Sequence, residues 1–453
     1  MTTEAPRQLP LWRTFLVFLL PMMLSNILQS LSGTLNGVFL GQLIDVDAMA
    51  TASVLFPVMF FCISLVIGVA TGATVLIGQA YGARDMALVR RIAGLVLLVV
   101  LISGVVIGGL GAVFAPDLLR ILGTPENIFA DATRYARIIM VSMPVMFLFI
   151  LATSILRGVG DTVTPLWALI FSTLTGAILT PALILGWAGL PKLGPPSAAI
   201  ASVVSITVAL AWLCWRMNQK KMAVAPNIEL FRHMRFDGAM LARVLRIGVP
   251  TGVQMVIFAL SEIVLLGLAN AYGSDVTAAY GATTQVLSYV QFPAMSIGIS
   301  ASILAAQAIG AGKADSLDKI MRTAQLLNLV ITGLGVIVVY LLSHTIISLF
   351  ITEPDVIKMT DRLIAIVLWS LLLFGVSVAF SGIMRGSGTV LAPTGIAIFA
   401  ILAVEIPVAI VMTRHIGVEG VWWAYPAAFA AMAVMQGAYY YLVWRRQKIE
   451  RLV

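Results

Sequence analysis

Twelve long apolar segments run through this chain of 453 residues, and they constrain its fold more than any other feature. A segment of about 20 mostly apolar residues can cross a bilayer as a helix. Only 11% of the residues are charged, whereas a soluble domain carries roughly a quarter. The segments lack the strict apolar and polar alternation of barrel strands. We therefore predict an all-α integral membrane protein. Its twelve transmembrane helices are expected near residues 13–40, 50–77, 92–115, 136–156, 163–189, 196–215, 245–271, 277–309, 323–350, 363–384, 390–413 and 418–444.

The basic residues predict the orientation of these helices. Most of the 28 Lys and Arg residues fall on the face that carries both termini. The exceptions are Arg120, Arg134, Arg137, Lys192, Lys358, Arg362 and Arg414. Basic loops favour the cytoplasmic side, so both termini should be cytoplasmic in a multi-pass protein of the bacterial inner membrane. Because basic loops account for the net charge of +8, we expect membrane lipids and no nucleic acid among its partners.

The second half of the chain repeats landmarks of the first at an offset of 228 to 229 residues. Gln79–Ala83 returns as Gln307–Ala311, and Arg157–Gly160 returns as Arg385–Gly388. Six spans in each half make the repeats parallel, which predicts two six-helix bundles related by a pseudo-twofold axis along the membrane normal. The expected domains are an N-terminal lobe at 1–215, a cytoplasmic linker at 216–244 and a C-terminal lobe at 245–453.

Six short motifs are distributed along both halves of the chain. They are Pro21 with the later Leu40-Gly41, Gly78–Ala83, Leu156–Thr162, Gln307–Lys313, Met384–Gly386 and Gly417–Trp423. In this order they resemble the multidrug and toxic compound extrusion (MATE) family, from about Leu11 to Trp444. The resemblance implies a secondary antiporter that exports organic cations or amphipathic drugs by alternating access, in exchange for protons or sodium ions. It implies no other cofactor, and we expect a monomer.

Two carboxylates, Glu262 and Glu405, lie well inside predicted spans, where an ionisable side chain is costly and usually functional. Low-dielectric surroundings favour a neutral carboxyl group, which suits exchange of a proton for a cation. Met255 and Phe258 precede Glu262 by seven and four residues, so all three should share one helical side and contact a bound cation. Glu262 also matches the seventh-span Glu of the NorM-like branch of the family. We predict ion coupling at Glu262 and Glu405, although either could instead be structural.

Polar side chains in the eighth and first spans are candidates for a substrate cavity. In the eighth span, Tyr280, Thr284 and Gln291 share one helical face, and Gln285 and Tyr289 share a neighbouring one. In the first span, Gln29, Ser32 and Asn36 follow Ser25 on one face. Hydrogen bonding between helices is the alternative role for both sets.

The chain departs from the family in its first half. Members commonly carry an Asp in the first span where this chain has Asn36, and an Asn and an Asp in the fifth span where Gly176 and Thr180 align. Asn36 cannot titrate, so coupling should rest on the C-terminal lobe.

Other classes of function are weaker predictions. Gly158–Thr162 lacks the ending of a phosphate-binding loop. We find no catalytic constellation and no metal-ligand spacing, so we do not expect an enzyme. A flippase for lipid-linked or polysaccharide substrates is the alternative, since related families share this duplicated design. An anionic lipid would call for several basic residues inside the spans, and none is found there.

Overall fold

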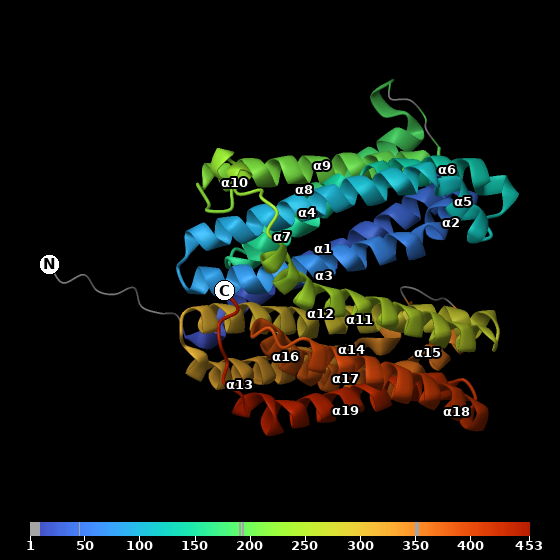
Figure 1. Cartoon of the computed structure of the whole chain (residues 1–453). Helices are drawn as coiled ribbons and strands as arrows, with labels where there is room; N and C mark the ends of the chain where they lie inside the picture. The colour runs from blue at the N-terminus through green and yellow to red at the C-terminus, as the bar shows by residue number, and fades with distance from the viewer. Residues whose placement is uncertain (1–9, 45, 190–191, 193, 349–352) are drawn as a thin grey trace. The chain divides into compact units, whose positions relative to one another are not determined.

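The computed structural model describes residues 10–44, 46–189, 192, 194–348 and 353–453, and every element assigned in them is helical (Figure 1). The chain forms two compact units. The N-terminal unit is Leu24–Gly252, and the C-terminal unit combines the residues up to Met23 with Val253–Val453.

The N-terminal unit contains most of α1, all of the helices from α2 to α10, and the start of α11. Its elements are α1 (Leu11–Leu43, shared with the other unit), α2 (Val46–Val54), α3 (Phe56–Gly82), α4 (Met86–Val113), α5 (Ala115–Ile121), α6 (Glu126–Val141), α7 (Met143–Gly158), α8 (Val163–Leu185), the 3₁₀ turn η1 (Trp187–Gly189), α9 (Pro196–Gln219) and α10 (Ile228–Arg232).

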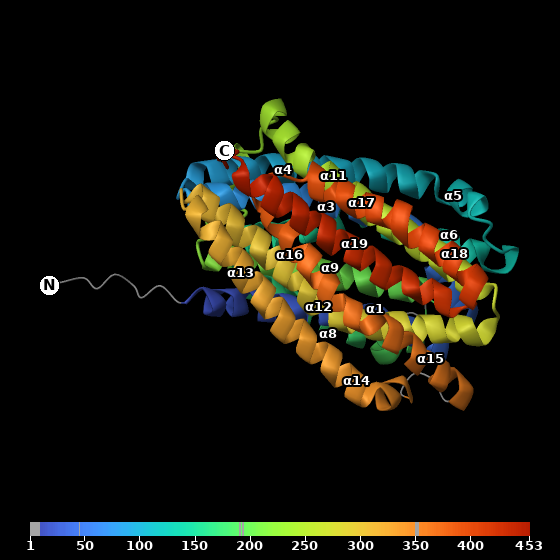
Figure 2. The same cartoon turned by 90° about the horizontal axis from the view of Figure 1, so that it is seen from below.

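The C-terminal unit contains two π-helical stretches, η3 and η5, within its long helices. Its elements are α11 (Gly238–Asn270, shared), α12 (Ser274–Gly310), η2 (Ala314–Ser316), α13 (Leu317–Leu327), η3 (Asn328–Thr332), α14 (Gly333–Ser348), α15 (Pro354–Val367), η4 (Leu368–Ser370), α16 (Leu371–Gly386), α17 (Leu391–Phe399), η5 (Ala400–Glu405), α18 (Ile406–Ile416), α19 (Glu419–Leu442) and η6 (Trp444–Arg446). Helix α16 packs against both α12 and α19 in this unit, and Figure 2 shows the three helices side by side.

Two long helices pass from one unit into the other. The first turns of α1 belong to the C-terminal unit, where Phe15 and Leu19 are buried in an apolar cluster with Ile297. The first turns of α11 belong to the N-terminal unit, where Gly248 meets Gly68 of α3. A Cβ atom on Gly68 would lie 2.4 Å from the Gly248 carbonyl oxygen, so only glycine allows this approach of the two backbones.

The helices account for all twelve predicted spans. Within the described residues, ten helices, counting those continuous through a π or 3₁₀ stretch, are long and apolar enough to cross a membrane. The pair α6 and α7, bent by 47° next to Pro144, adds one more candidate. The twelfth predicted span coincides with α19, a helix of 24 residues that carries Tyr425 and Gln436 and is not among these candidates. Pro144 lies inside the predicted span 136–156, where a proline favours such a bend. The π-helical stretches were not predicted.

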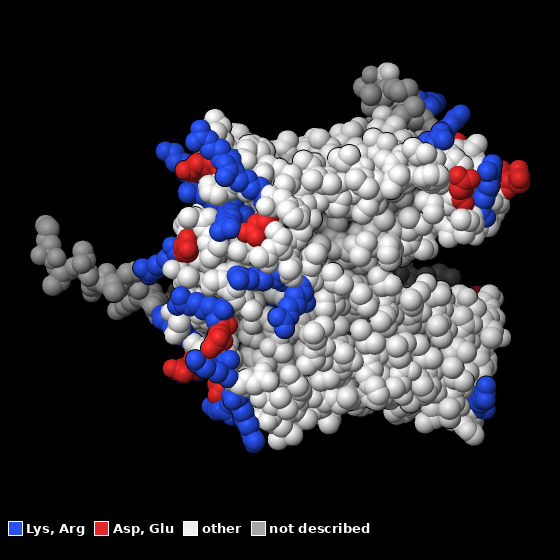
Figure 3. Space-filling view, in the orientation of Figure 1, with Lys and Arg blue, Asp and Glu red and all other residues white. Residues whose placement is uncertain are grey.

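Charged side chains gather at the helix ends. On the side shown in Figure 3, Lys and Arg lie mainly at one end of each unit, and the flanks between the ends carry none. An uncharged belt is what lipid-facing helices require.

The apolar core of the C-terminal unit encloses two buried tyrosines in the membrane-spanning region. One apolar cluster there includes Leu265 of α11, Val286 of α12, and Trp422 and Phe429 of α19. Tyr280 and Tyr425 are buried in the same cluster, and both side chains bring a hydroxyl group that needs a partner.

Candidate functional site

The hydroxyl groups of Tyr280 and Tyr425 converge on Glu262. Tyr280 of α12 donates a hydrogen bond to Glu262 Oε2 at 2.8 Å, and Tyr425 of α19 donates to the same oxygen at 2.9 Å. The two tyrosine oxygens lie 2.9 Å apart. Three oxygen atoms from three helices therefore form a nearly equilateral triangle, which we call the Glu262 triangle.

Aromatic rings surround this triangle on the α19 side. The Tyr280 ring lies 5.0 Å from the Trp422 ring, which stacks at 6.1 Å on Tyr425. Phe429 continues the row, 6.1 Å from Tyr425. Trp422 is fully buried, and its indole Nε1 has no hydrogen-bond partner within the described residues. The site thus combines one carboxyl group with several aromatic rings in an apolar setting.

Glu405, the second predicted carboxylate, lies in the same unit at the end of the π-helix η5. The side chain is 2% exposed and close enough to interact electrostatically with Glu262. Ser261, the residue before Glu262, lies beside it. Pro407 follows two residues later at the start of α18, and π-helical turns often mark functional positions. Pro407 can be read from the sequence, whereas nothing in the sequence predicts the π-helix.

The other predicted cavity residues of the C-terminal unit make no hydrogen bond to Glu262 within the described part of the chain. The Thr284 hydroxyl donates to the Tyr280 backbone carbonyl at 2.7 Å, and Gln285 donates to the exposed Tyr289 hydroxyl at 3.2 Å. Gln291, Met255 and Phe258 are half-buried. Of the predicted set, Tyr280 alone bonds to a predicted carboxylate among the described residues. Cavity lining by the remainder stays a prediction.

In the N-terminal unit, one predicted cavity residue of α1, Asn36, bonds to two neighbouring helices. Asn36 accepts a hydrogen bond from Thr180 of α8 at 3.3 Å and donates one to Ser202 of α9 at 3.5 Å. Ser32 is half-buried and Gln29 is exposed. Asn36 and Thr180, which the sequence analysis predicts to occupy acidic positions of the family, are thus in contact here as a neutral pair.

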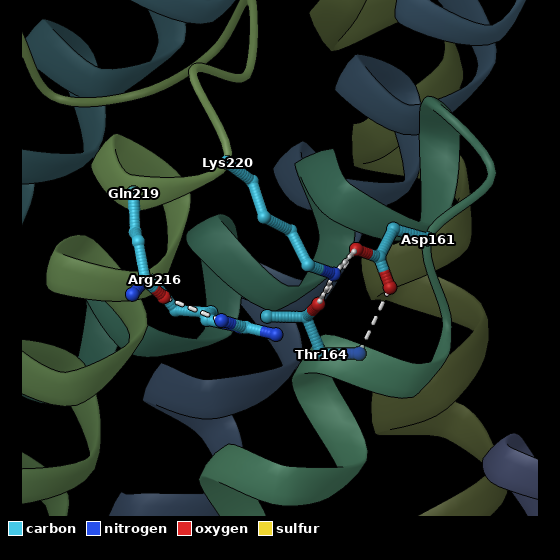
Figure 4. A network of polar contacts seen from close by, with 5 residues as sticks. All are labelled: Asp161, Thr164, Arg216, Gln219 and Lys220. Atoms are coloured by element: carbon cyan, nitrogen blue, oxygen red, sulfur yellow. Dashed lines mark hydrogen bonds and ion pairs between the residues drawn. The ribbon is translucent and has the colours of Figure 1, made fainter.

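The loop after α7 contributes to a network of polar contacts (Figure 4). Asp161 accepts hydrogen bonds from the Thr164 amide at 2.8 Å and hydroxyl at 2.6 Å, and Lys220 Nζ lies 3.3 Å from Asp161 Oδ2. Burial would raise the pKa of Asp161, but the Thr164 hydrogen bonds and the Lys220 charge lower it overall. The network fastens the start of α8 to the end of α9.

Tyr425 is the functional candidate that the sequence analysis missed. It lies 163 residues from Glu262 in an apolar span, just after the motif Gly417–Trp423. The adjacent residue, Pro426, gives no sign of a partner for a carboxylate.

Comparison with known proteins identifies the fold and its duplication. The sequence model of the MatE family matches residues 21–182 and, a second time, residues 250–411. The chain belongs to the MatE family. The two matches begin 229 residues apart, which confirms the predicted internal repeat of this transporter family.

Relatives of this MatE-family chain cover its full length. It is 42% identical over 455 residues to the probable multidrug resistance protein YoeA of Bacillus subtilis, with 100% of this chain and 98% of the relative covered. It is 25% identical over 444 residues to the multidrug export protein MepA of Staphylococcus aureus, covering 97% and 96%.

Solved structures share its fold. The Vibrio cholerae MATE transporter VcmN matches with a TM-score of 0.89 at 20% identity, covering 97% of this chain and 98% of that one. A MOP superfamily transporter from Pyrococcus furiosus gives 0.87 at 20% identity, with 95% of each chain covered. These matches confirm the predicted fold class of twelve transmembrane helices in two bundles. The chain is a multi-pass membrane protein of a transporter family.

Proposed function

We propose that this transporter exports organic cations or amphipathic drugs in exchange for protons, with Glu262 as the main coupling residue and Glu405 as its partner. Multidrug relatives, which include a 42% identical protein, support the class of substrate. The Glu262 triangle is the observation that carries the choice of coupling ion.

Counting hydrogens in the triangle favours a bound proton. Each of the three edges is a hydrogen-bond distance of 2.8 to 2.9 Å. Two tyrosine hydroxyls supply two hydrogens, and an ionised carboxylate supplies none. A proton on Glu262 supplies the third hydrogen. Glu262 then donates to one tyrosine hydroxyl, that hydroxyl donates to the other tyrosine, and the second tyrosine donates to Glu262, so that each oxygen donates once and accepts once around the ring. The arrangement therefore suits the proton-loaded carboxyl group.

The same distances disfavour a metal cation inside the triangle. A cation in the plane of the three oxygens, at edges of 2.8 to 2.9 Å, would lie about 1.7 Å from each oxygen, whereas even Mg²⁺ needs about 2.0–2.1 Å. A sodium ion, larger than Mg²⁺, would have to push the helices apart. Proton coupling requires no such rearrangement.

The aromatic row beside Glu262 suits an organic cation as the competing ligand. Aromatic faces attract cations through their quadrupole, most strongly when the site is desolvated. Once the proton leaves, the carboxylate and the rings of Tyr280, Trp422 and Tyr425 offer negative charge and aromatic faces together. Met255 and Phe258 on α11 would extend this apolar wall. Proton and substrate would then bind alternately to one carboxyl group.

The N-terminal unit is proposed to contact substrate without carrying the coupling ion. Asn36, Thr180 and Ser202 form a hydrogen-bonded group with no ionisable member. Coupling would therefore depend on the C-terminal unit. We further propose that a monomer suffices and that both termini are cytoplasmic in a bacterial inner membrane.

Transport in proteoliposomes tests the proposal. Vesicles containing wild type, Glu262→Gln or the control Glu126→Gln, which removes an exposed carboxylate at the start of α6, would be loaded with ethidium and given first a pH gradient and then a sodium gradient. We expect pH-driven movement in wild type and in Glu126→Gln, and its loss in Glu262→Gln. Movement driven by sodium alone would contradict proton coupling. Normal pH-driven transport by Glu262→Gln would show that Glu262 is structural, and lipid movement without ethidium movement would favour a flippase.

A further inference from the structure

The segment between α9 and α11 exposes large apolar side chains on the surface of the N-terminal unit. Ile228 is 74% exposed, Phe231 55% and Phe236 72%. Asn227 caps α10 by accepting a hydrogen bond from the Leu230 amide at 3.0 Å. Leu230 is 2% exposed and packs inward. Ile228 and Phe231, three residues apart, share the opposite, outward face of this short helix.

Two ion pairs hold this segment against α4. Arg90 lies 3.4 Å from Glu229, and Arg91 lies 2.6 Å from Asp237. One pair fixes α10 and the other fixes the start of α11, on either side of the exposed phenylalanines. The apolar side chains are therefore presented from an anchored segment whose conformation is already set.

The charge of the segment is strongly positive. Residues 216–246 contain seven basic and two acidic side chains. Both acidic residues, Glu229 and Asp237, already pair with arginines of α4. Lys221, Arg232 and Arg235 are exposed next to the apolar side chains. Exposed aromatic and aliphatic groups framed by Lys and Arg are typical of segments that lie in the interface of an anionic membrane.

The position of the segment puts such an interface within reach. It joins the ends of α9 and α11, two helices that are long and apolar enough to cross a membrane, so it emerges where their lipid headgroups lie. In Figure 1, α10 lies at the end of α9. Figure 3 shows that Lys and Arg gather at this end of the unit.

We propose that the segment around α10 is a binding surface for anionic phospholipid, with Ile228, Phe231 and Phe236 inserted at the headgroup level and Lys221, Arg232 and Arg235 on the lipid phosphates. The proposal uses the cytoplasmic placement of the linker but not the ion coupling. It adds a lipid-binding surface, outside the transport site, that fixes the linker to one leaflet.

Collisional quenching in the intact transporter tests the surface. In a Cys62→Ala/Cys214→Ala background, a bimane label would be placed at Phe231→Cys or at the control Ala83→Cys, an exposed position on the turn after α3. Both proteins would be reconstituted in phosphatidylcholine nanodiscs and titrated with phosphatidylglycerol that carries a nitroxide near the top of its acyl chain. We expect the label at position 231 to be quenched more strongly than the label at position 83.

A charge variant tests the anionic component. Each Lys or Arg near a membrane surface contributes up to about five-fold in affinity for anionic lipid. Replacing Lys221, Arg232 and Arg235 with Gln should weaken the apparent affinity for phosphatidylglycerol at position 231 by up to that factor per residue. Because the three side chains are exposed, the variant should fold normally, which a thermal melt checks. Equal quenching at the two label positions, or a titration unchanged by the charge variant, would overturn the proposal. Neither readout requires transport, so failure here is distinct from failure of the proposed function.

Discussion

Removing one hydroxyl group from the Glu262 triangle isolates the proposed coupling chemistry from the packing around it. In Tyr280→Phe or Tyr425→Phe the ring remains, so the contacts with Trp422 are kept. What is lost is one donor to Glu262 Oε2, at 2.8 Å or 2.9 Å. The variant therefore perturbs the carboxyl group while leaving the apolar cluster filled.

The size of the effect follows from the type of hydrogen bond. When Glu262 is ionised, both tyrosines can donate to it, and a hydrogen bond to a charged group contributes about 1.5–3 kcal/mol. If the ionised state is reached during the rate-limiting part of the cycle, losing one such bond should slow pH-driven transport by about 10- to 160-fold. The two substitutions contact the same oxygen, so their combined effect should not be additive.

The assay is initial pH-driven ethidium movement in proteoliposomes at equal protein content. Tyr340→Phe is the matched control, because it removes a hydroxyl of α14, in the same unit, that bonds to the Ala365 backbone carbonyl instead of to Glu262. We expect the control to transport at close to the wild-type rate. If Tyr280→Phe and Tyr425→Phe also transport at the wild-type rate, the triangle plays no part in coupling and the hydrogen count behind the proton assignment is irrelevant to transport.

Further predictions concern packing and the charged network. Gly382→Ala should lower the free energy of unfolding of the detergent-solubilised protein by about 1–3 kcal/mol, because the new Cβ atom would lie 2.3 Å from the Gly298 carbonyl oxygen. Gly267→Ala is the control, because a Cβ atom there would have nothing within 4 Å, and its melting temperature should be unchanged or higher. Asp161→Asn should destabilise by about 1–3 kcal/mol near neutral pH. Since the pKa of Asp161 is lowered in the fold, its bonds to Thr164 and Lys220 stabilise above its ordinary pKa of about 4 and are lost as pH falls through the lowered value. The melting difference between wild type and Asp161→Asn should therefore shrink in acid, and a difference independent of pH would contradict this account.

The sequence by itself was enough to predict the membrane fold of this protein and to single out Glu262, a carboxyl group whose transfer into lipid costs much free energy. Twelve apolar segments, the repeat at 228 to 229 residues and the basic loops all follow from transfer energies and chain order, which need no tertiary contacts to be recognised. Glu262 could be singled out for the same reason, since a carboxyl group inside an apolar helix is expensive wherever its neighbours lie.

Only the tertiary structure decided which groups meet that carboxylate. Tyr425 is 163 residues away from Glu262, and one polar hydroxyl in an apolar helix carries no periodic signal. The π-helix before Glu405 was invisible because it changes the backbone hydrogen bonds without changing composition. The passage of α1 and α11 between the units was equally hidden. Hydropathy reports the free energy of each residue in lipid, whereas a site depends on the packing that brings distant helices to the same point.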